Sequence, residues 1–133
     1  MRAKPPLRAA LLALVSAIAV STATLAGPED YEFQLFESEI KRGDAATVAV
    51  RLTDKRTGDP VVDAVVFATR MDMQPDGMEA MTTPVEAMPS GEPGVYRFRT
   101  NLTMAGSWRF SIAAKVQGEA ETVESRLVFE AVE

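Results

Sequence analysis

Apolar and polar residues alternate along most of the chain after residue 30, and this alternation is the period of a half-buried β-strand. In the clearest case Tyr96, Phe98 and Leu102 alternate with Arg97 and Arg99. The pattern predicts strong strands in six segments: 31–35, 48–52, 61–71, 96–102, 108–116 and 123–129. A shorter strand is expected near 83–87, and no segment after residue 30 has a convincing helical period.

Short clusters of glycine, proline and charged residues separate these segments, as turns do. Seven strands joined by such turns predict an all-β fold, an immunoglobulin-like antiparallel β-sandwich of about seven strands. Trp108 is the only tryptophan and lies on an inward register, so it is expected to anchor the core. Tyr96, in the run Gly94-Val95-Tyr96, is in a position to act like a tyrosine corner.

The first residues have a different pattern. Three basic residues precede an apolar run at 9–20, and small residues follow at 21–27. This order predicts a cleavable signal peptide over residues 1–26, with the folded domain at 27–133. Cleavage is expected after Ala26, with Ala23 as the alternative. A permanent anchor is disfavoured because a spanning helix needs about 20 apolar residues. The domain is therefore expected in the periplasm, without stable membrane insertion after cleavage.

Net charge and composition exclude several classes of function. Residues 27–133 carry 11 basic and 19 acidic side chains, a net charge of −8. An acidic domain repels phosphate backbones, so no nucleic-acid partner is expected. The chain has no cysteine and no histidine. The commonest catalytic base and metal ligand are therefore missing, and no enzyme is expected.

Four methionines fall within 71–81: Met71, Met73, Met78 and Met81. The segment also contains Pro-Asp-Gly at 75–77, so it is expected to be a loop with a turn in its middle. A thioether is a soft, neutral donor that suits Cu(I). Met71 and Met73 would leave one face of an extended chain about 6.6 Å apart, and the turn would bring Met78 and Met81 back over them.

The alternative is that these methionines fill gaps in the core, since Met71 lies on the inward register of its strand. Met88 is a weaker candidate ligand. The carboxylates of the segment, Asp72, Asp76 and Glu79, are expected at a solvated loop edge.

The runs Met71-Asp72-Met73, Gly94-Val95-Tyr96 and Met104-Ala105-Gly106-Ser107-Trp108 resemble the YtkA-like/FixH-like family of exported domains. The resemblance covers about residues 31–129. It implies an immunoglobulin-like sandwich in the bacterial periplasm and an association with copper handling, oxidase assembly or metal efflux. The family motif also adds Met104, beside a glycine-containing turn, to the candidate ligands.

Together these features predict a periplasmic metal-binding accessory protein that handles or transfers Cu(I). The expected ligands are Met71, Met73, Met78, Met81 and Met104. The alternative is a metal-free interaction module that presents the Met-rich segment to a periplasmic protein partner, such as an oxidase-assembly or efflux component.

Overall fold

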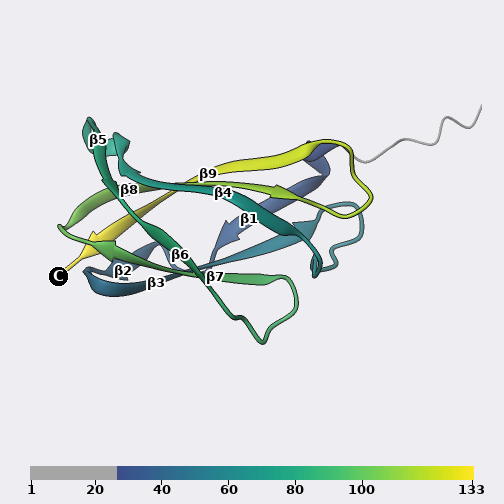
Figure 1. The fold of residues 1–133 in the computed structure, drawn as a ribbon, viewed down its shortest axis with the longest axis horizontal. Helices are drawn as coiled ribbons and strands as arrows, with labels where there is room; N and C mark the ends of the chain where they lie inside the picture. Colours follow the sequence, from purple (N-terminus) through teal and green to yellow (C-terminus); the bar gives the residue numbers. More distant parts are fainter. Residues whose placement is uncertain (1–26) are drawn as a thin grey trace, which may run out of the picture.

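Two β-sheets packed face to face make up residues 27–133, the part of the chain that the computed structural model describes (Figure 1). The predicted signal peptide at 1–26 lies outside the described residues. Within 27–133, no helix is both long and apolar enough to cross a membrane.

The first sheet has the strand order β1-β3-β7-β6, and the second has the order β2-β9-β8-β4-β5. The strands of the first sheet are β1 (Tyr31–Leu35), β3 (Gly43–Asp54), β7 (Val95–Leu102) and β6 (Val85–Met88). Those of the second are β2 (Glu39–Lys41), β9 (Thr122–Val132), β8 (Gly106–Lys115), β4 (Val65–Met73) and β5 (Met78–Thr83). Short 3₁₀ turns, η1 (Pro28–Asp30) and η2 (Gln74–Asp76), precede β1 and join β4 to β5.

The predicted fold class is confirmed, since the described chain is an immunoglobulin-like sandwich of antiparallel strands with one parallel pair, β2 with β9. Each of the six strongly alternating segments contains a strand, although the one expected from residue 61 begins at Val65. The strands number nine rather than about seven because both edge segments change sheets. The chain crosses from β1 to β2 near residues 36–38, and from β5 to β6 at Pro84.

The core lies between the sheets and is built from the inward positions of the alternating strands. Trp108 is fully buried, as predicted, and its Nε1 donates a hydrogen bond to the Met104 carbonyl at 3.1 Å. Phe98 of the first sheet meets Phe110 of the second with ring centroids 5.1 Å apart. With no cysteine in the sequence, this packing and the two hydrogen-bonded sheets hold the domain together.

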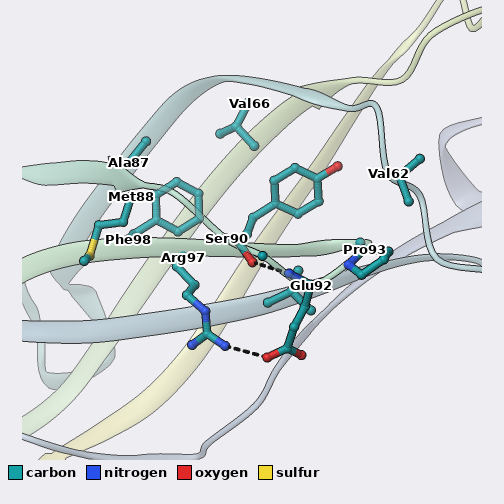
Figure 2. Close-up of a pocket in the computed structure, with 13 residues that line it drawn as sticks. Val62, Val66, Ala87, Met88, Ser90, Glu92, Pro93, Arg97 and Phe98 are labelled. Carbon is teal, nitrogen blue, oxygen red and sulfur yellow. Dashed lines mark hydrogen bonds and ion pairs between the residues drawn. The ribbon is translucent and has the colours of Figure 1, made fainter.

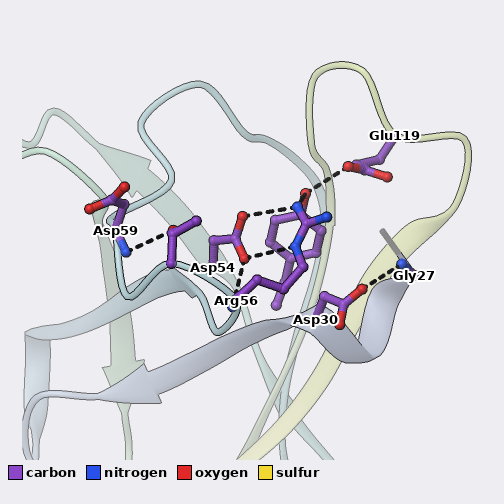
Figure 3. Close-up of polar contacts among 8 residues, drawn as sticks. Gly27, Asp30, Asp54, Arg56, Asp59 and Glu119 are labelled. Atoms are coloured by element: carbon purple, nitrogen blue, oxygen red, sulfur yellow. Dashed lines mark hydrogen bonds and ion pairs between the residues drawn. The ribbon is translucent and has the colours of Figure 1, made fainter. Parts of the chain in front are cut away.

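One end of the sandwich is tied by polar side chains, drawn in Figure 3. The Tyr31 hydroxyl donates to Glu119 in the β8–β9 loop at 2.8 Å, and Arg56 Nη2 lies 3.4 Å from the same hydroxyl. Arg56 also pairs with Asp54 at the end of β3. These contacts join the start of β1 to two loops. The β4–β5 hairpin and the C-terminus lie at the opposite end (Figure 1).

Candidate functional site

The segment expected to be a loop is a hairpin, and its turn is well defined. β4 continues through Met73, and Gln74-Pro75-Asp76 then make a single 3₁₀ turn. Gly77 ends this turn at φ +74°, and its amide donates to the Gln74 carbonyl at 2.8 Å. The left-handed residue reverses the chain, and as a result Met78 lies directly opposite Met73.

The hairpin is irregular just before its turn. Asp72 pairs with Thr82 and Met73 pairs with Met78, so residues 79–81 form a bulge that has no partner on β4. Met81 belongs to this bulge and is 37% exposed. Bulges re-aim side chains near functional sites, and this one sets Met81 at the rim of the same sandwich end as Met78.

The first two predicted ligands lie in the core, which corrects the expectation that they are free in a loop. Met71 and Met73 are both 0% exposed. The alternation of β4 continues to residue 73, so both side chains point inward between the sheets. Met71 lies opposite Phe110 on one side and Thr83 on the other, which places it beneath the hairpin rather than at its rim.

The other candidates are accessible to different degrees. Met78 is 38% exposed, and Met104 is partly buried against the core. Met88 is on β6 in the other sheet. The structure therefore brings Met73, Met78 and Met104 to one end of the sandwich, with Met81 beside them. It leaves Met71 deeper in the core and Met88 elsewhere.

Gly106 is where the β4–β5 hairpin meets the segment that carries Met104. A methyl group added at Gly106 would lie 2.8 Å from Met73 Cε and 2.5 Å from Asp76 Oδ2. Gly106 also has φ +140°, which side chains rarely adopt. Because residue 106 has no side chain, β8 can begin directly against the end of the Met73 side chain. The Met-x-Met and Met-x-Gly-x-Trp runs thus meet at one point.

Asp76 fastens the turn to β8. Its Oδ2 accepts a hydrogen bond from the Ser107 amide at 2.9 Å. Asp76 is exposed in the turn, as expected for a solvated loop edge, and its carboxylate also links two elements. It holds η2 over the first residues of β8 and so keeps Met73, Met78 and Gly106 in a constant arrangement.

Asp72 was also expected at a solvated edge, and the structure corrects this: the residue is 0% exposed. Arg70 Nε and Arg109 Nη2 each lie 2.9 Å from its Oδ2, and the Gln74 amide donates to its Oδ1 at 2.9 Å. Burial opposes ionisation of Asp72, but the hydrogen bonds from Arg109, Gln74 and Arg70 outweigh it and lower the pKa of the carboxyl.

The same arginines hold the bulge in place. Arg70 Nη2 donates to the Glu79 carbonyl at 3.0 Å, and Arg109 Nη2 lies 3.4 Å from Glu79 Oε1. The network is therefore a positioning device beside the thioethers. Arg109 comes from the neighbouring strand β8, and its register against Asp72 could not be read from the order of residues along the chain.

The donor set at this end of the sandwich is soft. Within residues 27–133, no cluster of three or more histidine, cysteine, aspartate or glutamate side chains is arranged to hold a metal ion. Asp72 already has arginine partners, and Asp76 accepts from a backbone amide. The same end of the sandwich also carries the thioethers of Met73, Met78, Met81 and Met104, and thioethers favour Cu(I) over hard cations.

Comparisons with known proteins identify a family and distant structural likenesses. A family model described as YtkA-like matches residues 25–113. No curated protein matches the chain significantly in sequence. Among solved structures, the Lin-41 filamin domain is 18% identical with a TM-score of 0.48, covering 77% of this chain and 92% of its own. The ZirS C-terminal domain is 16% identical with a TM-score of 0.47, covering 87% of this chain and 75% of its own.

A conjugative transposon lipoprotein from Bacteroides eggerthii is more distant, at 12% identity and a TM-score of 0.35. It covers 75% of this chain and 96% of its own.

Proposed function

The chain belongs to the YtkA-like family, and from this premise we propose that it is a periplasmic accessory protein that binds Cu(I) through thioethers at the hairpin end of the sandwich. The ligands in this proposal are Met73, Met78 and Met104, with Met81 as an additional donor from the bulge. Met71 is removed from the ligand set because Phe110 and Thr83 flank it in the core.

The observation that carries the proposal is the meeting of Met73, Met78 and the Met104 segment. Directly opposite residues of an antiparallel pair have Cβ atoms about 5 Å apart and project to the same side, so the side chains of Met73 and Met78 share one face. Gly106, two residues beyond Met104, touches the terminal methyl of Met73. The segment that carries Met104 therefore lies beside the paired Met73 and Met78, and this arrangement supports the proposed ligand set.

The exposure of the site favours exchange of the ion over storage. Met78 and Met81 are more than one-third exposed, and the buried Met73 lies behind them. A partner protein could therefore reach an ion held here. Neutral thioethers also need no deprotonation before they coordinate, so Cu(I) affinity should change little between pH 5 and pH 8.

The test is a Cu(I) titration against a chromogenic chelator under reducing conditions, with protein purified from bacteria that express the whole chain. The Met78→Leu, Met104→Leu double variant is expected to lose affinity about tenfold or more, because two of the donors become hydrocarbon. Met88→Leu is the matched control, since Met88 is similarly exposed but lies in the other sheet. Equal affinities for the wild type, the double variant and the control reject this site.

A second candidate function is a metal-free interaction module, and a specific observation favours it. Among the described residues, most of the large exposed apolar side chains lie along β4, β5, β6 and the loop before β4: Val62, Val65, Phe67, Met78, Met81 and Met88. Val62, Val65 and Phe67 follow one another closely around the start of β4, and grouped apolar exposure of this kind is typical of a protein-interaction surface.

A further inference from the structure

The β4 strand has a long partner strand on one side only. β8 pairs with it from Val65 to Asp72, with a shift of register between Val66 and Ala68, whereas β5 pairs with it only from Met71 to Met73. At Pro84 the chain leaves for the first sheet, where β6 pairs with β7. Within residues 27–133, the edge of β4 from Val65 to Arg70 therefore has no strand paired with it, although β6 lies across the hollow beside it. We call this stretch the free edge.

The free edge has little of the usual protection of exposed strands. Natural edge strands are covered, shortened or bulged, or carry charges and prolines that block the addition of another strand. This stretch has one irregularity, at Phe67, and one charge, on Arg70. From residue 65 to residue 69 the sequence is Val-Val-Phe-Ala-Thr, and the first charge is Arg70. Val65 is 64% exposed and Phe67 is 59% exposed. Large apolar side chains therefore face solvent on a strand with open backbone groups.

A groove runs beside the free edge, where the two sheets separate. One hollow of about 490 Å³ is lined in part by Val62, Val66, Met88 and Phe98 (Figure 2). A second of about 140 Å³ lies between Phe67 and Val85. Val66, Ala87 and Phe98 line both hollows, so they form one continuous apolar floor.

The groove is held open by fixed contacts. The Tyr96 hydroxyl donates to the Val61 carbonyl at 2.8 Å and accepts from the Ala64 amide at 3.1 Å. These bonds hold the loop before β4 in place. On the opposite wall, Thr100 donates to the Pro84 carbonyl at 2.8 Å, at the point where the chain changes sheets. A partner strand would therefore meet a preformed surface, which lowers the entropy cost of binding.

The charges around the groove indicate which kind of partner segment would bind there. The ion pairs beside it, Glu92 with Arg97 and Glu86 with Arg99, balance internally. Asp63, just before β4, adds a negative charge, the positive charge of Arg70 is paired with Asp72, and residues 27–133 as a whole carry −8. A second copy would bring another −8 against the first, whereas basic residues flanking a strand would be attracted.

We propose that the free edge of β4 binds an extended segment of another protein as an added strand. The segment places apolar side chains at alternate positions into the groove and carries lysine or arginine at its ends. Main-chain hydrogen bonds to residues 65–70 supply affinity, and the floor around Val66 and Phe98 supplies selectivity. This inference rests on the interaction function, not on copper.

The probe is a short synthetic peptide of alternating valine and threonine with lysines at both ends, added to the isotope-labelled protein with a copper chelator present. Binding is expected to shift the backbone NMR signals of 62–70 and to slow amide exchange along 65–70. Phe67→Lys should weaken binding about tenfold or more, because it places a charge in the apolar groove. Val128→Lys is the matched control, since Val128 is 54% exposed on β9, away from the groove.

Three outcomes overturn the inference. The first is no shift at 62–70 up to about 1 mM peptide. The second is equal binding by a glutamate-flanked peptide, which removes the charge argument. The third is protection of the 65–70 amides without peptide together with dimerisation in sedimentation, which makes a second copy the occupant. Peptide binding with no Cu(I) affinity would reject the copper function alone, and the reverse result would reject the free-edge proposal alone.

Discussion

At the scale of single residues, Asp72 is the clearest case of a side chain whose burial is set by the side chains around it. It lies between two inward-facing methionines, yet it is fully buried because Arg70 and Arg109 cover it from the outer side of the sheet. Its carboxylate holds the first amide of the turn as well as two guanidinium groups. The residue therefore positions Met73 without being a ligand.

Replacing Asp72 tests this role. Asp72→Asn leaves two arginines facing a neutral amide, and breaking a buried pair in this way is expected to cost about 3 kcal/mol of unfolding free energy. Urea unfolding at neutral pH measures the loss. Glu86→Gln is the control, because its pair with Arg99 is exposed and worth less than about 1 kcal/mol. Equal losses for the two variants would contradict the positioning role.

The lowered pKa of Asp72 gives the same residue a pH dependence. Its contribution to stability is present above the pKa of the unfolded carboxyl, about 3.9, and is lost as pH falls through the lower folded pKa. Wild-type stability should therefore decrease more steeply than that of Asp72→Asn as pH falls below about 4. Parallel acid-unfolding curves for the two proteins would show that Asp72 is not responsible.

At the scale of elements, two glycines shape the thioether site in different ways. Gly77 turns the β4–β5 hairpin at φ +74°, and a side chain there would meet only open space. Gly106 begins β8 at φ +140° and lies against Met73 Cε and Asp76 Oδ2. Gly77 is therefore needed only for its backbone conformation. Gly106 is needed both for its backbone conformation and because a side chain there would collide with Met73 and Asp76.

Alanine at these two positions should separate the effects. Gly77→Ala is expected to cost about 1 kcal/mol from left-handed strain, with little change in Cu(I) affinity. Gly106→Ala should cost about 2 kcal/mol and also weaken Cu(I) binding, because the new methyl displaces Met73 and Asp76. Thermal unfolding and the competitive Cu(I) titration measure the two quantities. Unchanged copper affinity in Gly106→Ala would separate Gly106 from the metal site.

At the scale of the whole molecule, the two ends of the sandwich are held by different means. The hairpin end is tied by Asp72 and Asp76, and the opposite end by Tyr31, Glu119 and Arg56. Burial, together with the hydrogen bond to Glu119 and its charge, raises the pKa of Tyr31 to about 12. Since the folded protein favours the neutral phenol, this end is sensitive to alkaline pH.

The raised pKa of Tyr31 predicts where that sensitivity appears. Its contribution is complete below the ordinary tyrosine pKa of 10.0 and is lost as pH rises toward about 12. Tyr31→Phe should flatten the alkaline decline in stability, followed by circular dichroism in urea, and should leave Cu(I) affinity unchanged because the ends lie far apart. An alkaline decline identical to that of the wild type would contradict the assignment to Tyr31.

The sequence alone determined the sandwich, the burial of Trp108 and the family resemblance, because alternation records which residues of a strand share a face. Only the tertiary structure decided how far each face is covered. The β8 and β5 strands beside β4 bury Met71 and Met73, and Arg109 reaches Asp72 from a strand distant in sequence. The register of β4 against β8 shifts between Val66 and Ala68, which takes Phe67 out of the inward alternation and leaves it exposed. Exposure depends on which strands become neighbours and in what register, and that information is not local to any segment.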